Sequence, residues 1–298
     1  MIRMTSALPR FLYSFLVALS CLLVSGDLLA NSCERPAQLR FSLVPQGDVA
    51  KDIADLQPLF RNLERALKMP VVAITPSSYG AVVEGLLSGA VDLARLGPAA
   101  YVAAKKQDPA ITAFATYART ADIFKQEGAS YYSLLLTRSD DTYDNLSSLR
   151  GKTIALVDPD STSGAVIPRR MVKRESGAPL EQFFGRAVYS GSHDKSIMLV
   201  TNSDVDAAFV SSSHVSTLVE SGRVKLDDLK VLWRSGLIPR DPFVLRGQLC
   251  KDIQEKIRTV FLNQMGSNSQ AVLKNLRATS FFPVKDSDYQ IIRDAANP

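Results

Sequence analysis

Apolar residues follow two different periods along the chain, and the two periods alternate. Short apolar runs, typical of buried strands, are separated by longer segments in which apolar residues recur every three or four positions, as on one face of a helix. Ser77-Ser78 and Gly97-Pro98 stand where helices are expected to begin. Strands are predicted at residues 39–44, 71–74, 91–96, 111–117, 131–137, 152–157, 187–189, 205–210 and 229–233.

Helices are predicted between these strands, and two of them contain a proline. The apolar stripe of residues 48–68 includes Pro58, which predicts a break or a fresh start there. Pro168 predicts that the helix after Thr162 starts near Ile167 or kinks at that point. The tail from about Cys250 is expected to be mostly helical.

The alternation of strands and helices predicts an α/β fold in which helices cover both faces of parallel sheets. The pattern runs through two blocks, so two lobes are expected. Residues 31–138 and 236–298 would form lobe 1, and residues 139–235 lobe 2. In open α/β sheets the ligand crevice lies at the carboxyl ends of the strands.

Hydroxyl-bearing and aromatic residues gather at several of these carboxyl ends. Asp158 to Gly164 runs from a strand end into a turn that holds Ser161, Thr162 and Ser163, and His193 follows another strand. Backbone N–H groups and hydroxyls in such turns can converge on one anion without a large fixed charge. A hydroxyl run of this kind can also be only a helix cap, and a histidine there can be structural.

The first thirty residues have the order of a secretory signal peptide. Arg3 and Arg10 precede an apolar run over 11–24, which is too short to span a bilayer comfortably, and Ala30 suits the position before the cut. A lipoprotein cut before Cys21 is the alternative. Removal of residues 1–30 takes away both arginines and one aspartate, so the net charge falls from +5 to +4. This mild excess does not indicate a nucleic-acid binder.

Two cysteines and two histidines remain after this processing. An exported chain favours a disulfide between Cys33 and Cys250, with two buried thiols as the alternative. Their wide spacing predicts no metal site, and no cofactor is expected. An exported hydrolase using a serine with His193 or His214 is the remote alternative, because the chain lacks a Gly-x-Ser-x-Gly motif. The sequence therefore indicates a binding protein, not an enzyme.

The order and spacing of several short segments resemble one family. The family is the periplasmic substrate-binding proteins of phosphonate, phosphite and phosphate ABC importers, and the resemblance covers roughly residues 38–265. The matching segments are Tyr79-Gly80, Leu96 to Tyr101, Tyr131 to Leu135, Leu149 to Thr153, Asp158 to Gly164, Gly191 to Asp194, Val205 to Ala208 and Ile238 to Pro242.

The resemblance implies a two-lobed, hinge-closing protein of the type II periplasmic binding fold, with helices flanking a parallel or mixed sheet in each lobe. By position, Tyr79 and Tyr131 would reach the ligand from the first lobe. The hydroxyls of Ser161, Thr162 and Ser163 would hold the phosphorus oxygens from the second, and His193 would add a donor.

Asp241 matches one of the two carboxylates that hold the amine in aminophosphonate binders of the family. The other should fall near Ser211 to His214, where this sequence has no acid. A smaller anion such as phosphate, phosphite or methylphosphonate is therefore at least as well supported as an aminophosphonate.

The resemblance implies a monomeric periplasmic protein that delivers its anion to the membrane subunits of an ABC importer. A module that reports the same ligand to a membrane sensor kinase would have the same fold and site, and the sequence leaves this alternative open. No nucleic-acid partner is expected.

Overall fold

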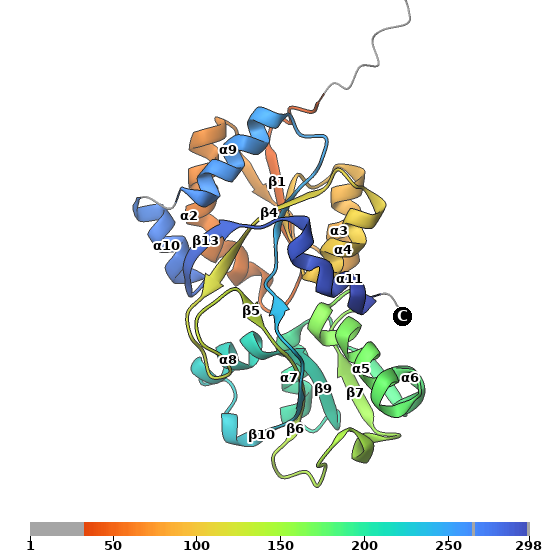
Figure 1. Cartoon of the computed structure of the whole chain (residues 1–298). Helices are drawn as coiled ribbons and strands as arrows, with labels where there is room; N and C mark the ends of the chain where they lie inside the picture. Colours follow the sequence, from red (N-terminus) through yellow and green to blue (C-terminus); the bar gives the residue numbers. More distant parts are fainter. Residues whose placement is uncertain (1–32, 264–265, 297–298) are drawn as a thin grey trace, which may run out of the picture. The chain divides into compact units, whose positions relative to one another are not determined.

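Two separate β-sheets organise the chain from Arg35 onward, which forms one unit (Figure 1). The computed structural model describes residues 33–263 and 266–296, so the predicted signal peptide, residues 1–30, lies outside the described part. Cys33 and Cys250 are disulfide-bonded, as expected. Within the described residues, no helix combines the length and the apolar character needed to cross a bilayer.

The first sheet has six strands in the order β13-β4-β12-β3-β1-β2. The strands β1, β2 and β3 are parallel, whereas β12 runs antiparallel to both β3 and β4, and β13 runs antiparallel to β4. The strand bounds are β1 Leu39–Leu43, β2 Val71–Ala73, β3 Leu93–Arg95, β4 Thr112–Arg119, β12 Phe243–Leu245 and β13 Ala278–Pro283.

Helices cover both faces of this sheet. Leu39, Phe41 and Leu43 of β1 pack with α2, α9 and α10, while Ala94 of β3 packs with α3 and α4 on the other face, because successive strand residues point to opposite sides. The helix bounds are α2 Val49–Leu67, α3 Tyr79–Ser88, α4 Pro98–Gln107, α9 Lys251–Leu262, α10 Ser267–Asn275 and, packed against α4, α11 Gln290–Ala296. This sheet and its helices are called the first lobe below.

The second sheet has five strands in the order β10-β6-β9-β7-β8. The strands β7, β8 and β9 are parallel, and β6 runs antiparallel to its neighbours β9 and β10. The bounds are β6 Ser133–Arg138, β7 Thr153–Leu156, β8 Arg186–Tyr189, β9 Ala207–Ser211, β10 Leu229–Arg234, α5 Ile167–Ser176, α6 Leu180–Phe183, α7 His193–Thr201 and α8 Ser212–Glu220. One face packs with α5 and α6 and the other with α7 and α8, and together they form the second lobe.

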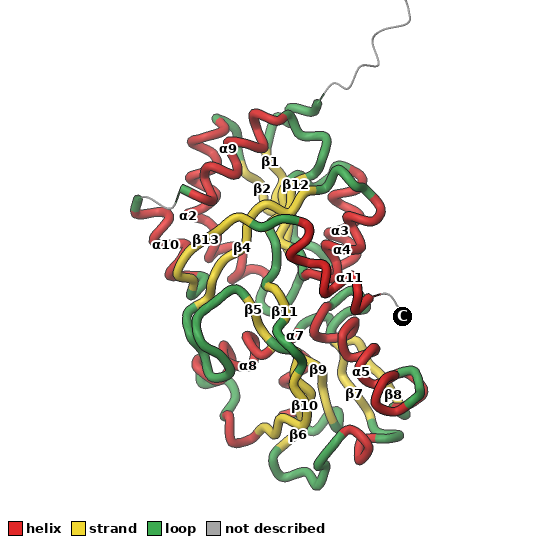
Figure 2. The backbone as a smooth tube through the Cα atoms, viewed as in Figure 1, coloured by secondary structure: helices red, strands yellow, loops and turns green. Residues whose placement is uncertain are grey.

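Two short strands join the lobes. The chain passes from the first sheet to the second through β5, Ser130–Tyr131, and returns through β11, Ile238–Pro239. These strands pair antiparallel, with Ile238 opposite Tyr131, and Figure 2 shows them between the two sheets. The two crossings therefore run side by side as a two-stranded ribbon.

The α/β fold with two lobes is confirmed, with three differences in detail. The strand predicted at 131–137 was expected in the first block, but its residues 133–138 form β6, whose leucines pack inside the second lobe. The tail is not only helical, because β13 adds an edge strand to the first sheet. The helix α2 continues through Pro58, which is buried in it. The predicted lobe boundaries, with lobe 1 over 31–138 and 236–298 and lobe 2 over 139–235, stay a proposal.

Candidate functional site

The hydroxyl turn after β7 is built as the sequence indicates. Ser161 caps the short helical turn Thr162–Val166: its hydroxyl accepts a hydrogen bond from the Gly164 N–H at 3.2 Å. Gly164 is needed here, since a Cβ would lie 2.5 Å from Val157. Pro168 then occupies the first turn of α5, which begins at Ile167 as predicted. The side chains of Ser161, Thr162 and Ser163 are almost fully buried.

Three hydrogen bonds join this region of the second lobe to the first. The Thr162 hydroxyl accepts from the Ala99 N–H at the start of α4 at 2.8 Å. The Asp158 carboxylate accepts from the Tyr79 N–H at the start of α3 at 3.3 Å, and the His193 N–H donates to the Gln46 carbonyl at 2.9 Å. The two lobes are therefore in direct contact around the predicted site.

The two predicted tyrosines lie between the lobes, and both are buried. Burial raises the pKa of the Tyr79 phenol well above its usual value, and the charge of Asp241 adds to the rise. The pKa of Tyr131 is raised by the same two causes in the same order. Because one carboxylate acts on both rings, the two phenols lie near each other. Both remain protonated hydrogen-bond donors at neutral pH.

Two buried hydroxyls of this site have no direct hydrogen-bond partner among the described residues, although the nearby hydroxyls of Ser161 and Ser163 act on the phenols of Tyr79 and Tyr131, respectively. These are the Tyr79 Oη and the Ser163 Oγ atoms. Ser163 offers its backbone carbonyl to the Ser133 hydroxyl at 2.7 Å, which fixes the position of the residue while leaving its own hydroxyl unused. A buried donor without an acceptor costs free energy, so both groups are poised for an acceptor from outside the chain.

His193 begins α7 and is held in one tautomer. The Ser211 N–H donates to its Nδ1 atom at 3.1 Å, so the neutral ring carries its proton on Nε2. Burial lowers the pKa of His193 well below its usual value, and the ring of His214, with its centroid 4.9 Å away, lowers it further. His193 is therefore a neutral donor at physiological pH. The hydroxyls of Tyr79, Tyr131, Ser161, Thr162 and Ser163, together with His193, are called the cradle below.

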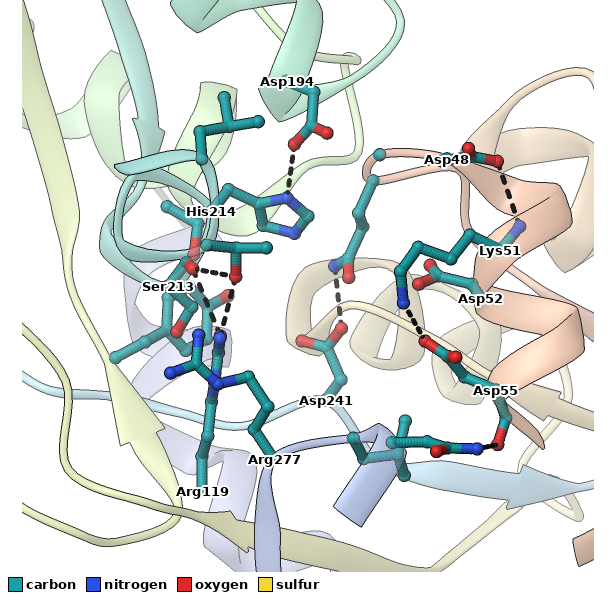
Figure 3. Close-up of a pocket in the computed structure, with 18 of the residues that line it drawn as sticks. Asp48, Lys51, Asp52, Asp55, Arg119, Asp194, Ser213, His214, Asp241 and Arg277 are labelled. Carbon is teal, nitrogen blue, oxygen red and sulfur yellow. Dashed lines mark hydrogen bonds and ion pairs between the residues drawn. The ribbon is translucent and has the colours of Figure 1, made fainter. Parts of the chain in front are cut away.

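A cavity of about 320 Å³ opens beside the cradle (Figure 3). Of the seven predicted site residues, Tyr131 and Asp241 line it, and the other five are buried and do not line it. Figure 3 shows Asp241 between the acidic side of α2, with Asp52 and Asp55, and the opposite wall, where Ser213 and His214 lie. The structure thus brings all seven predicted residues into one region.

Asp241 is held by an amide and not by an arginine. Its Oδ2 atom accepts from the Gln46 Nε2 atom at 2.7 Å, and within the described residues it forms no ion pair. Burial raises the pKa of the Asp241 carboxyl, although the charges of Arg95 and Arg240 act in the opposite direction. An ion pair with a neighbouring arginine is therefore not what holds this side chain.

Three buried arginines on the cavity wall were missed by the sequence analysis, which expected a site without large fixed charges. Arg95 ends β3, Arg119 ends β4, and Arg240 follows β11. Each lies where a strand ends at the cavity. A charged residue at the end of an apolar strand was therefore the signal in the sequence that could have predicted these residues. The cradle itself is neutral, but its surroundings are not.

The hydrolase alternative finds no catalytic arrangement. The Nδ1 atom of His193 accepts from a backbone amide, so no carboxylate orients this ring for proton transfer. His214 does bond Asp194 at 2.9 Å, but no serine hydroxyl of the described residues bonds its ring. No group of three metal-ligating side chains occurs in the described ranges.

Comparisons with known proteins agree with this architecture. The phosphate-import protein PhnD of Mycolicibacterium smegmatis is 30% identical over 278 residues, covering 87% of this chain and 84% of that protein. The phosphonates-binding periplasmic protein of Escherichia coli is 28% identical over 277 residues, covering 90% of this chain and 78% of that one.

Solved structures share the fold. PhnD1 of Prochlorococcus marinus, solved with methylphosphonate, aligns with a TM-score of 0.76 at 20% identity over 88% of this chain and 97% of that chain. A binding-protein component of a phosphonate ABC transporter from Pseudomonas aeruginosa gives 0.77 at 24% identity over 88% and 86%.

A family model matches most of the chain. It describes the periplasmic substrate-binding protein of phosphonate ABC transporters and spans residues 41–289. This confirms the family resemblance and the expectation of a binding protein that is not an enzyme. The chain belongs to the periplasmic substrate-binding proteins of phosphonate ABC transporters.

Proposed function

We propose that the protein captures a phosphorus oxyanion, as phosphonate, phosphite or phosphate, in the cradle and releases it to an ABC importer. The phosphorus oxygens would accept hydrogen bonds from the cradle, and Asp241 would face the part of the ligand that points into the cavity. The names of the relatives, which mention phosphate import and phosphonate binding, support this class of ligand.

The observation that carries the proposal is the pair of unpartnered hydroxyls. Tyr79 Oη and Ser163 Oγ are buried without a direct hydrogen bond among the described residues, and the groups nearest to them, the Ser161 hydroxyl and the Tyr131 phenol, are themselves donors. Leaving such donors unsatisfied costs about 1–3 kcal/mol each. An oxyanion between the lobes would satisfy both at once, which explains why polar groups are kept at these buried positions.

The neutrality of the cradle supports reversible capture. An anion that enters a closed cleft loses its water and needs replacement donors. Phenols whose pKa values are raised by burial, hydroxyls and a neutral imidazole supply these donors without a fixed charge of their own. Such a site can hold an anion firmly and still release it when the cleft opens.

Closure of the two lobes would couple binding to shape. The ribbon of β5 and β11 is the natural hinge, because only these two paired segments cross between the sheets in the described part of the chain. The Ala99–Thr162 and Gln46–His193 hydrogen bonds would form only in the closed state. Export through cleavage of residues 1–30 would place the protein in the periplasm, where membrane subunits of the importer could read the closed form.

Titration calorimetry on the processed chain, residues 31–298, tests this function. Phosphate, phosphite, methylphosphonate, 2-aminoethylphosphonate and sulfate are titrated separately into protein that has been unfolded, dialysed and refolded to remove carried-over ligand. We expect a phosphorus anion to bind tightly and sulfate to bind more weakly. Absence of heat with every phosphorus compound, from protein that melts cooperatively, would contradict the proposal.

A further inference from the structure

Two buried arginines on the cavity wall have no carboxylate partner. The side chains of Arg119 and Arg240 are 8% and 6% exposed, and both line the cavity. Within the described residues neither forms an ion pair, whereas Arg95 on the same wall is paired with Asp52 at 3.0 Å. Buried charges are normally paired, because an isolated one loses its hydration without compensation. The arrangement therefore lacks one anionic group.

The hydrogen bonds of these guanidinium groups do not supply that charge. Arg119 donates to the Ser213 carbonyl at 3.2 Å and to the Thr217 hydroxyl at 2.8 Å. Arg240 donates to the Ser130 carbonyl at 3.3 Å and to the Ser213 hydroxyl at 3.1 Å. All these acceptors are neutral, and the Nε atoms of both arginines are buried without a partner among the described residues.

The two arginines are close enough to repel each other. Burial and the positive charge of Arg240 lower the pKa of Arg119 to about 10, so Arg119 remains protonated at neutral pH. The guanidinium of Arg240 is held over the rings of Tyr117 and Tyr131, at 5.3 and 5.8 Å from their centroids. Two like charges fixed side by side at a cavity are stabilised by an anion that contacts both.

The arginines adjoin the cradle through shared residues. Tyr131 belongs to the cradle, lines the cavity and stacks on Arg240. Ser213, near which an amine-binding acid was expected, gives its hydroxyl and its carbonyl to the two arginines instead. An amine at this wall would meet positive charge, and a carboxylate would meet two fork-shaped donors.

Asp241 does not remove this need for an anion. It is a buried carboxylate of the same cavity, but its Oδ2 atom bonds Gln46 and it pairs with neither arginine. Its charge reaches both Arg95, which is already paired with Asp52, and Arg240, but without a direct ion pair to either. Arg119 and Arg240 therefore have no carboxylate in direct contact, although the charge of Asp122 reaches Arg119 and that of Asp241 reaches Arg240.

We propose that the ligand is a phosphonate that carries a carboxylate, with its phosphorus group in the cradle and its carboxylate on Arg119 and Arg240. This inference rests on the proposed function and narrows its substrate class. Such a ligand is larger than phosphate or methylphosphonate and would occupy more of the cavity of about 320 Å³.

Calorimetry with matched pairs of ligands tests the inference. Ethylphosphonate and 3-phosphonopropionate differ only in the carboxylate, and phosphonoacetate shortens the spacing by one carbon. We expect either 3-phosphonopropionate or phosphonoacetate to bind about 10- to 100-fold more tightly than ethylphosphonate, because its carboxylate would accept charge-assisted hydrogen bonds from the arginines. Equal or weaker binding of both would overturn the inference while the proposed function stands. Failure of every phosphonate to bind, and of phosphite and phosphate as well, would remove the proposed function.

Variants locate the carboxylate. Arg119→Gln should remove most of the preference for the carboxylated ligand, Arg119→Lys should restore part of it, and the affinity for ethylphosphonate should change much less. The matched control is Arg223→Gln, since Arg223 lines the same cavity but is exposed and paired with Asp194. A preference that survives in Arg119→Gln, or that is lost equally in the control, would overturn the assignment.

Discussion

The cradle and the arginine pair lie side by side, but they use opposite electrostatic strategies. In the cradle, burial keeps Tyr79 and Tyr131 protonated and His193 neutral, so every side-chain donor there is uncharged. Next to the cradle in space, the arginines Arg119 and Arg240 are buried without a carboxylate partner in the described chain. One region offers dipoles to an anion, and the other offers charge.

This difference separates two tasks of a binding protein. Neutral donors suit a group that every ligand of the family shares, because they recognise its oxygens and still allow release. Fixed charges suit discrimination, because a ligand without a matching anion leaves them uncompensated, and a ligand with a cation is repelled. The cradle would therefore set the class of ligand, and the arginine pair its organic group.

The largest effect is expected where a cradle residue also joins the lobes. Thr162→Val keeps the shape of the side chain but removes both a ligand donor and the acceptor of the Ala99 N–H. Two such losses of about 1–3 kcal/mol each should weaken binding of the tight phosphorus ligand by roughly 100-fold or more. Calorimetry measures this change.

Thr112→Val is the matched control for this variant. Thr112 lies in β4, and its hydroxyl bonds only the nearby Ala110 carbonyl at 3.0 Å. It should leave the affinity unchanged. An undiminished affinity in Thr162→Val would show that Thr162 neither binds the anion nor closes the lobes.

A smaller effect is expected from the Ser163 hydroxyl, which has no direct hydrogen-bond partner among the described residues. Ser163→Ala should weaken binding by about tenfold, because it removes one buried donor from the ligand. It should not lower the melting temperature, since the ligand-free chain gains nothing from an unpartnered hydroxyl. Calorimetry and thermal unfolding of the same sample measure the two quantities.

Thr137 offers a close comparison within the second lobe. Its hydroxyl is also buried without a described partner, but it lies in β6 away from the cavity lining. Thr137→Val should therefore leave the affinity unchanged and should not destabilise the fold. If both variants weakened binding equally, the loss would reflect general softening of the lobe and not contact with the ligand.

The sequence predicts the cradle well because each of its parts is local. The hydroxyls of Ser161 to Ser163 are three neighbours at a strand end, and Ser192 and Ser78 cap the helices that begin with His193 and Tyr79. The arginine pair is not local. Arg119 and Arg240 are 121 positions apart and meet only because β4 and the segment after β11 run beside each other.

The same limit explains the misplaced strand. The apolar run Leu134 to Leu136 predicts a buried strand equally well in either lobe, because composition fixes burial but not the partner strand. Pairing with β9 and β10 depends on residues more than 70 positions away. In the tail, β13 was missed for a similar reason: as an edge strand beside β4, it carries only a weak apolar pattern.

The smallest predicted effect concerns the pH dependence of the free energy of unfolding, which tests whether His193 is neutral in the folded protein while the nearby arginines are charged. Burial holds the pKa of the folded side chain well below the value near 6.5 expected when the chain is unfolded. As the pH falls below about 6.5, the unfolded chain therefore binds a proton that the folded chain does not. The free energy of unfolding should fall on acidification, by at most about 1.4 kcal/mol per pH unit from this residue.

His193→Gln isolates this contribution, because the glutamine oxygen can still accept from the Ser211 N–H and cannot take up a proton. Denaturant unfolding of the wild type and the variant at pH 7.5, 6.5 and 5.5 measures the difference in slope. Other titrating groups, including Asp241 with its raised pKa and the nearby His214, are present in both proteins and cancel in this difference to first order. A steeper loss of stability in the wild type is expected. Parallel slopes would mean that the folded imidazole takes up a proton as readily as the unfolded one. At acidic pH the cradle would then hold its anion partly by charge, just as the arginines are proposed to do.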